Sequence, residues 1–205
     1  MEAGKLYMIT APSGAGKTSL VKTLVNQNDN LCVSISHTTR PPRNSELDGV
    51  NYHFIKNNEF MEMLSQGQFL ESANVYGHYY GTSRTWVDEQ LESGNNVILE
   101  IDWQGARQVR DLLPNVCSIY ILPPSLEALT KRLKDRGQDD DDTIENRMKE
   151  AQSVIAHVTE ADFVVVNDEF ELAIKNINAI INSQGLNTKP QELDLTDLIE
   201  RLTQK

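Results

Sequence analysis

Residues 5–20 read KLYMITAPSGAGKTSL, and this stretch is the clearest indication of the architecture. The run from Lys5 to Thr10 is short, apolar and rich in residues that favour β-structure, which predicts a buried strand. The glycine-rich segment from Ala11 to Thr18 follows directly. Lys17 to Gln27 then has the apolar spacing of an amphipathic helix. A strand, a glycine loop and a helix in this order are typical of an α/β protein built on a parallel sheet.

The glycine-rich segment has the pattern of a phosphate-binding loop except at Ala11, where that pattern begins with glycine. Its glycines allow successive backbone N–H groups to surround phosphate oxygens at the positive end of the following helix. Lys17 is expected to reach the β and γ phosphates of a nucleoside triphosphate, and Thr18 to offer a hydroxyl to Mg²⁺. The residues predicted to contact the triphosphate here are Ala11, Pro12, Ser13, Gly14, Ala15, Gly16, Lys17, Thr18 and Ser19. The alternative, an incidental glycine-rich turn, does not require the flanking strand and helix.

Strands and helices continue to alternate along the chain. Further strands are predicted at Cys32–Ile35, Val97–Ile101, Val116–Leu122 and Phe163–Val166, and a helix at Ser83–Glu92 with Ser83 as its cap. Two segments interrupt the alternation, Ser36–Thr82 and Ser125–His157. Each is expected beyond the carboxyl ends of the strands, where a doubly wound sheet binds its ligands.

Composition restricts the classes of function. The 205 residues include 19 Lys and Arg against 30 Asp and Glu, for a net charge of −11. This charge argues against sequence-independent binding to nucleic acid. No apolar stretch is long enough to span a membrane, and the first residues lack a secretory pattern, so we expect a cytoplasmic protein with no membrane partner. Cys32 and Cys117 are expected to be free, buried thiols.

A second group of motifs lies downstream of the loop. These motifs are SHTTRPPR at 36–43, DGVNYHF at 48–54, FLE at 69–71, YYGTS at 79–83 and EIDWQG at 100–105. In this order, from about Leu6 to Ile181, the chain resembles the guanylate kinases. The resemblance implies a phosphate-loop kinase core with a parallel sheet flanked by helices, a GMP-binding insertion and a helical lid. It also implies transfer of the γ-phosphoryl group of MgATP to GMP, and to dGMP, in purine nucleotide metabolism and GMP recycling.

The resemblance also predicts how the chain is divided. Residues 1–35, 83–124 and 158–185 would form the core, residues 36–82 the GMP-binding subdomain and residues 125–157 the lid. Residues 186–205 fall outside the family pattern and read as a linker and a short amphipathic helix near Asp194 to Leu202. That helix is left open as an interface or a closing flap, and the chain as a monomer or a homo-oligomer.

Two arginines are candidates for gripping the acceptor phosphate. Arg40 and Arg43 lie three residues apart in a proline-stiffened loop, and their planar guanidinium groups suit bidentate binding of a phosphate. Taken alone, they also fit ordinary surface arginines. By the resemblance, Arg40, Arg43, Tyr52 and Tyr80 hold the GMP phosphate.

Glu71 follows two apolar residues on a predicted strand and matches the family's guanine-reading carboxylate. Guanine presents a ring N–H beside an amino group, and one carboxylate accepts from both, whereas adenine offers no such pair. By the resemblance, Ser36 and Thr82 contact the base through their hydroxyls, although caps or strand ends would also explain them. Asp102 matches an acidic contact at the amino edge of the base.

Glu100 and Asp102 follow a buried run, and alternation places both carboxylates on one side of the strand end. We favour Asp102 for guanine, and Glu100 for the metal through water or for polar organisation of the site. The spacing does not rank them.

The second interruption carries Arg132, Arg136 and Arg147, which resemble the family's lid arginines. With Lys17 and Arg40 they complete the predicted catalytic set, since phosphoryl transfer requires positive charge around the moving group. Salt bridges to Asp135 or to the aspartate run at 139–142 are the alternative for each arginine. That run itself is predicted to be a solvated loop capping the next helix. Asn167 matches a family contact near the adenine of ATP.

Two other functions remain open. One is a non-catalytic guanylate-kinase-like module that binds proteins, but such modules tend to have a degraded phosphate loop, and Gly14, Gly16, Lys17 and Thr18 are intact here. The other is a related kinase with a different phosphorylated acceptor, which Glu71 opposes. The expected partners are therefore ATP and GMP.

Overall fold

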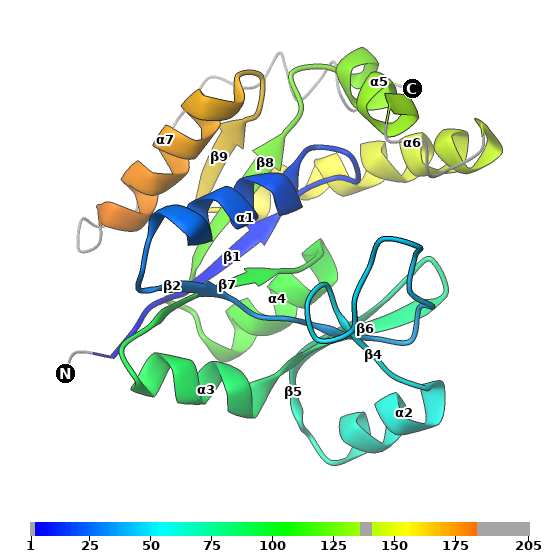
Figure 1. The fold of residues 1–205 in the computed structure, drawn as a ribbon. Helices are drawn as coiled ribbons and strands as arrows, with labels where there is room; N and C mark the ends of the chain where they lie inside the picture. Colours follow the sequence, from blue (N-terminus) through cyan, green and yellow to red (C-terminus); the bar gives the residue numbers. More distant parts are fainter. Residues whose placement is uncertain (1–2, 136–140, 184–205) are drawn as a thin grey trace. The chain divides into compact units, whose positions relative to one another are not determined.

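The computed structural model describes residues 3–135 and 141–183, as an alternation of strands and helices (Figure 1). The strands are β1 (Leu6–Thr10), β2 (Leu31–Val33), β3 (His37–Thr38), β4 (His53–Phe54), β5 (Phe69–Val75), β6 (His78–Ser83), β7 (Asn96–Glu100), β8 (Cys117–Leu122) and β9 (Phe163–Val166). The helices are α1 (Lys17–Gln27), α2 (Asn57–Ser65), α3 (Arg84–Glu92), α4 (Trp103–Leu112), α5 (Leu126–Asp135), α6 (Asp141–Ile155), the 3₁₀ helix η1 (Ala156–Glu160) and α7 (Phe170–Asn182).

The main sheet has five strands in the order β2-β7-β1-β8-β9. Leu31 of β2 pairs in parallel with Asn96 of β7, and Ile119 of β8 pairs in parallel with Phe163 of β9. All five residues of β1 are buried, as expected for a strand covered on both faces. The predicted α/β class with a parallel sheet and flanking helices is confirmed.

The contacts divide the chain into two compact units. Unit 1 comprises Met1–Met8 and Asn28–Val116, and unit 2 comprises Ile9–Gln27 and Cys117–Lys205. This division is by contact and is not the family's division into core, insertion and lid, so those boundaries stay a prediction.

Unit 1 has its own apolar core and a second sheet. The core joins β7 to α4 and α3, with Leu99, Val109 and Val87 almost fully buried. The second sheet has the order β4-β3-β6-β5, in which β3 pairs in parallel with β4 and β6 pairs antiparallel with both β3 and β5. This sheet and α2 lie in the first predicted interruption.

In unit 2, α1 and α7 lie side by side (Figure 1) and are joined by a hydrogen bond from Asn178 to Gln27. A separate apolar cluster contains Tyr120, Leu122 and Ile155, and the Tyr120 hydroxyl donates to the carbonyl of Val154 at 2.9 Å. These contacts anchor β8 and the end of α6 within one unit.

Some expectations need correction. Asp141 and Asp142 belong to α6, so the predicted aspartate loop is wrong for its second half, and its first half lies outside the described residues. Both cysteines are free, but each is half-buried because it lies at or near a strand end. The predicted C-terminal helix also lies outside the described residues. Within residues 3–135 and 141–183, no helix has both the length and the apolar character that crossing a bilayer requires.

Candidate functional site

The glycine-rich loop links β1 to α1 through two glycines in the left-handed region. Gly14 has φ of 89° and Gly16 has φ of 93°, conformations that cost other residues energy. The amide of Ala15 donates to the carbonyl of Pro12 at 3.1 Å, which closes the turn. Lys17 and Thr18 then form the first turn of α1. The loop therefore has the backbone that a phosphate-binding loop requires.

Asn167 follows β9 directly and contacts the glycine-rich loop, although the two are far apart in the sequence. Its side-chain Nδ2 donates to the carbonyl of Ala15 at 2.8 Å, and Asn167 is 4% exposed. A Cβ at Gly16 would lie 2.5 Å from that same Nδ2, so the contact requires glycine. The structure thus places Asn167 against the glycine-rich loop, and its predicted contact near the adenine of ATP stays a prediction.

Arg132 on α5 joins the same cluster. Its Nη2 donates to the carbonyl of Asn167 at 2.8 Å. Its Nη1 is buried and has no hydrogen-bond partner among the described residues. An unsatisfied buried guanidinium nitrogen is costly, and an anion would satisfy it. Arg147 lies half-buried on α6, whereas Arg136 is outside the described residues.

The residues at the start of α1 fit a magnesium ion bound together with a triphosphate. Mg²⁺ prefers oxygen ligands, keeps several waters and takes one or two ligands from protein. Thr18 offers a hydroxyl oxygen on the exposed first turn of α1, beside the phosphate loop. The donor chemistry at this position is therefore suitable.

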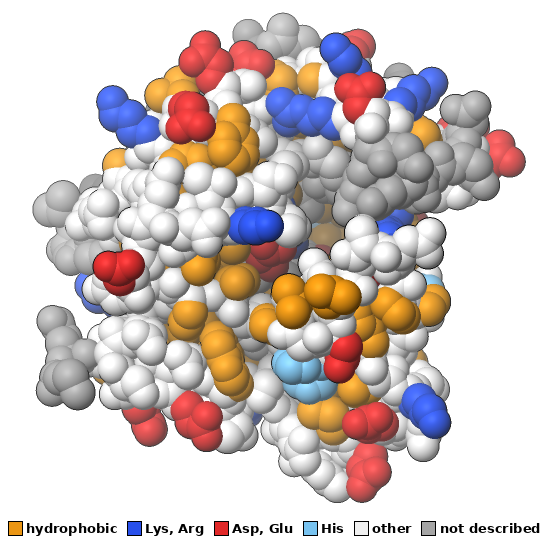
Figure 2. All heavy atoms as spheres, viewed as in Figure 1, with side chains coloured by type: hydrophobic (Ala, Val, Ile, Leu, Met, Phe, Trp, Pro, Cys, Tyr) orange, Lys and Arg blue, Asp and Glu red, His pale blue; other side chains and the backbone are white. Residues whose placement is uncertain are grey.

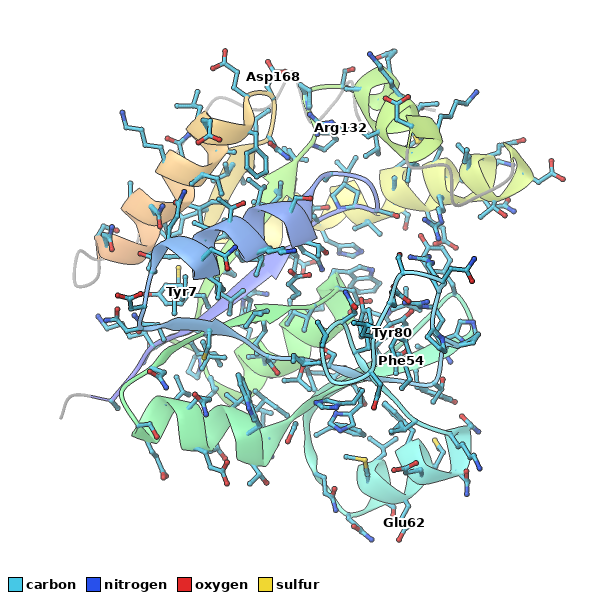
Figure 3. All side chains as sticks on the ribbon, in the orientation of Figure 1. Tyr7, Phe54, Glu62, Tyr80, Arg132 and Asp168 are labelled. Carbon is cyan, nitrogen blue, oxygen red and sulfur yellow. The ribbon has the colours of Figure 1, made fainter. Side chains whose placement is uncertain are left out.

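In unit 1, the side chains predicted to bind the acceptor phosphate cluster around Tyr52. The Arg40 guanidinium carbon lies 5.4 Å from the centre of the Tyr52 ring. Phe54 and Tyr80 each pack edge-on against Tyr52, with ring centroids 5.8 Å apart (Figure 3). Tyr80 also interacts favourably with the charged guanidinium of Arg40. The structure therefore brings together Arg40, Tyr52 and Tyr80.

The electrostatics of this cluster keep its groups in their ordinary charge states. Burial, reinforced by Tyr80 and Glu100, raises the pKa of Tyr52 to about 12 although Arg40 opposes the shift. Burial lowers the pKa of Arg40, but hydrogen bonds to Glu46 and Tyr80 outweigh it, so the net shift is upward. Near neutral pH the tyrosine stays a hydrogen-bond donor and the arginine stays charged.

Glu71 owes its position to an irregularity in β5. The register with β6 shifts between Phe69 and Glu71, which sets Glu71 opposite Thr82. Such bulges redirect side chains locally. The Thr82 hydroxyl donates to Oε1 of Glu71 at 2.6 Å, and the two residues are 0% and 4% exposed. The hydroxyl of Thr82, which was predicted to contact the base, therefore donates to the Glu71 carboxylate in this structure.

The other oxygen of Glu71 packs against the first turn of α4. A Cβ on Gly105 would lie 2.3 Å from Oε2 of Glu71. Asp102 is the N-cap of this helix, since its Oδ1 accepts from the amide of Gly105 at 2.9 Å and its Oδ2 from the Gln104 side chain at 3.1 Å. Gly105 therefore links the two predicted base-reading carboxylates.

The remaining predicted residues of unit 1 are placed as follows. Ser36 is 9% exposed, and its carbonyl accepts from the amide of His53 at 2.9 Å. Glu100 is the last residue of β7 and is half-buried. Asp102 lies past the end of that strand as a helix cap, so strand alternation does not describe the pair.

Reasoning from the sequence missed Glu46 and the close approach at Gly105. Glu46 accepts from Nη2 of Arg40 at 2.9 Å and from the amide of Arg43 at 2.8 Å. The sequence could have indicated the contact of Glu46 with Arg43, because a glutamate three residues after an arginine in a turn can fold back toward it. The close approach at Gly105 depends on the packing of α4 on β5 and leaves no local pattern.

The acidic chain shows no broad patch of positive charge among the residues that the structure describes on the face drawn in Figure 2. On the face drawn in Figure 2, the described Lys and Arg side chains are scattered singly among acidic and uncharged ones. The arginines described above are instead drawn into specific hydrogen bonds. Attraction for an anion is therefore a property of particular sites on this chain.

Comparison with known proteins gives the relatives of this chain. The sequence model of the guanylate kinase family matches residues 3–184. The guanylate kinase of Methylobacillus flagellatus is 51% identical over 199 residues, covering 97% of this chain and 98% of its own length. That of Vibrio cholerae is 48% identical over 204 residues, covering 98% and 99%. The crystal structure of guanylate kinase from Anaplasma phagocytophilum superposes with a TM-score of 0.76 at 30% identity, covering 100% of this chain and 98% of that one. The chain belongs to the guanylate kinase family.

Proposed function

We propose that this protein transfers the γ-phosphoryl group of MgATP to GMP, giving ADP and GDP. The observation that carries the proposal is the buried Glu71 carboxylate, fixed by Thr82 at 2.6 Å in the unit that also holds Arg40 and Tyr80. The two adjacent N–H groups of guanine are donors that this carboxylate could accept together. The family to which the chain belongs makes GMP the expected acceptor.

ATP is proposed to bind in unit 2. The backbone amides between Ala11 and Ser19 would surround its phosphates, with Lys17 reaching the β and γ groups. Thr18 would hold Mg²⁺. Glu100, which belongs to unit 1, is proposed to act on the metal only through water. Bound there, Mg²⁺ would neutralise charge on the phosphates. Asn167 would contact the adenine side of the nucleotide.

The acceptor phosphate is proposed to bind between Arg40, Arg43, Tyr52 and Tyr80. The guanidinium groups would grip its oxygens by charge-assisted hydrogen bonds, while the tyrosine hydroxyls donate further ones. The raised pKa of Tyr52, about 12, supports this role because a tyrosinate would repel the phosphate. Ser36, Glu71, Thr82 and Asp102 would read the guanine.

The chemistry would then consist mostly of positioning and charge. The GMP phosphate oxygen is itself the nucleophile, so no covalent intermediate with the protein is needed. Arg132, Arg136 and Arg147 would close over the triphosphate and stabilise the equatorial oxygens during transfer. The buried Nη1 of Arg132, which finds no hydrogen-bond partner in the described part of the chain, supports its inclusion. Closure would also exclude water and limit ATP hydrolysis.

We also propose that dGMP is accepted, and that the protein works in the cytoplasm in purine nucleotide metabolism and GMP recycling. None of the proposed acceptor contacts named above involves the 2′-hydroxyl of the ribose.

A coupled ADP-release assay with MgATP tests the reaction. With GMP, AMP, CMP and UMP compared as acceptors, release is expected with GMP alone. Folded protein that releases ADP with none of them would contradict the proposed reaction and favour a protein-binding module. Release with another acceptor would contradict the role of Glu71.

Substitution of Glu71 by Gln tests the selection of guanine. Gln offers one acceptor in place of two, and its amide nitrogen would face a donor of the base, so KM for GMP is expected to rise by about 100-fold or more. KM for ATP should change less than twofold, because ATP is proposed to bind in the other unit. An unchanged preference for GMP would overturn the assignment. Glu62→Gln on the exposed face of α2 is the matched control.

A further inference from the structure

The Glu46 carboxylate lies in the loop between β3 and β4 and contacts both phosphate-binding arginine candidates. Its Oε1 accepts from Nη2 of Arg40 at 2.9 Å, and lies 4.0 Å from Nη1 of Arg43. Its Oε2 accepts from the backbone amide of Arg43 at 2.8 Å. The amide of Glu46 in turn donates to the carbonyl of Arg43 at 3.0 Å. One carboxylate thus fixes a turn and a guanidinium together.

Arg40 is held from its other sides as well. Its Nη1 donates to the carbonyl of Pro41 at 2.9 Å. Its guanidinium carbon lies 5.4 Å and 5.8 Å from the ring centres of Tyr52 and Phe54. The rings hold the guanidinium of Arg40 close to them, and the ion pair with Glu46 fixes the direction in which its Nη2 points. Arg40 therefore has a defined orientation before any phosphate arrives.

The pair is well shielded from water. The side chains of Arg40 and Glu46 are 13% and 12% exposed. Burial raises the pKa of Glu46, but hydrogen bonds from the Arg40 side chain and the Arg43 amide outweigh it and leave the pKa below its ordinary value. Glu46 is therefore negatively charged at neutral pH.

A negative charge beside a site for an anion has two opposite effects. It repels the incoming phosphate, which weakens binding. It also keeps a flexible guanidinium in one orientation, which removes an ordering cost that binding would otherwise carry. The two effects predict opposite changes in KM when the charge is removed, so an experiment can separate them.

We propose that Glu46 is a positioning residue that presets Arg40 and the Arg43 turn to receive the phosphate of the acceptor nucleotide. This inference rests on the proposed function, because it takes GMP as the acceptor. Glu46 acts through the arginines and is not expected to touch the substrate.

The test measures steady-state kinetics of Glu46→Gln, which removes the charge and keeps the size. KM for GMP is expected to rise about tenfold, because Arg40 and Arg43 lose their shared partner. KM for ATP is expected to stay within twofold. A fall in KM for GMP would overturn the proposal, since it would mean that Glu46 only repels phosphate. An unchanged KM for GMP would overturn it too.

Glu62→Gln is the matched control, because Glu62 projects outward from α2 in the same unit (Figure 3). Its kinetic constants should equal those of the wild type. Glu46→Asp keeps the charge with a shorter reach and should recover part of the rise in KM. If Glu46→Gln does not fold by thermal melting, Glu46→Asp takes its place, and a KM for GMP equal to that of the wild type then overturns the proposal.

A double-mutant cycle with Arg40→Lys shows whether Glu46 acts through Arg40. Lys cannot reproduce the guanidinium contact with Glu46, so adding Glu46→Gln to Arg40→Lys should raise KM for GMP by clearly less than the tenfold expected in the wild-type background, leaving only the part that acts through the Arg43 turn. Full additivity would overturn the positioning role. Wild-type protein that does not use GMP would refute the proposed function, whereas active wild type with unaffected variants refutes this inference alone.

Discussion

For single residues, the position of the Glu71 carboxylate depends on the hydrogen bond from Thr82 and equally on the lack of a Cβ at Gly105. Thr82 fixes one oxygen at 2.6 Å, and the absence of a side chain at Gly105 leaves room for the other. A Cβ there would lie 2.3 Å from Oε2 and 3.4 Å from Cβ of Ile101. The Glu71 carboxylate would have to move, because a contact of 2.3 Å is too short, and its move would strain the bond from Thr82.

Gly105→Ala is therefore expected to reverse the ordinary effect of this substitution. In an unhindered helix, Gly→Ala stabilises a protein by about 0.5–1 kcal/mol. Here we expect a loss of about 1–3 kcal/mol by urea unfolding, and a KM for GMP that rises about tenfold with KM for ATP unchanged. Asp111→Ala, at an exposed position of the same helix, is the control. A more stable variant with normal GMP kinetics would show that Glu71 tolerates displacement.

For helices and strands, sequence patterns predicted the features that depend on neighbouring residues, namely element bounds and a helix cap. The bounds of β1 and α1 were predicted within a residue, and those of β9 as observed, because buried strands and helix spacing leave a clear pattern in the sequence. The Ser83 cap of α3 is confirmed by its 3.4 Å bond from the amide of Trp86. The bulge in β5 and the contact of Gly105 with Glu71 depend on partners distant in sequence, and no periodicity encodes them.

The pairing of β3 with β4 in the second sheet of unit 1 is expected to make the stability of the fold sensitive to acid. Parallel register sets His37 of β3 beside His53 of β4, with ring centroids 4.7 Å apart. Nδ1 of His37 is buried and has no hydrogen-bond partner among the described residues. Burial, and then the neighbouring His53, lower the pKa of His37 to about 4, although Asp48 opposes the shift. His37 is therefore neutral in the folded protein near pH 7.

A lowered histidine pKa makes the folded state less stable in acid. An unfolded histidine titrates near pH 6.5, so between about pH 6.5 and about pH 4 the unfolded chain binds the extra proton. The free energy of unfolding should fall by on the order of 1 kcal/mol from about pH 7 to about pH 5, allowing for partial exposure. Replacing His37 by Gln should remove that part of the loss, measured by urea unfolding at both pH values. Parallel profiles for variant and wild type would contradict this assignment.

At the scale of the whole molecule, each proposed nucleotide site has its own supporting contacts. The bonds of Asn167 to Ala15 and of Arg132 to Asn167 lie within unit 2. The bonds of Arg40 to Glu46 and of Thr82 to Glu71 lie within unit 1. With a net charge of −11, the chain attracts anions only where such local networks hold cations. Effects of substitutions on the two nucleotides should therefore separate.

Lys17→Ala tests this separation from the ATP site, whereas Glu71→Gln tests it from the GMP site. Loss of the lysine removes positive charge from the transferring phosphates, so kcat is expected to fall about 100-fold or more. Binding of GMP, measured by calorimetry without ATP, should change less than twofold, and the melting temperature should match that of the wild type. Lys22→Ala, an exposed lysine on the same helix, should leave all three quantities unchanged. If Lys17→Ala weakened GMP binding as much as it slowed transfer, the two sites would have to be energetically coupled. The contacts within each unit would then not be sufficient to define either site.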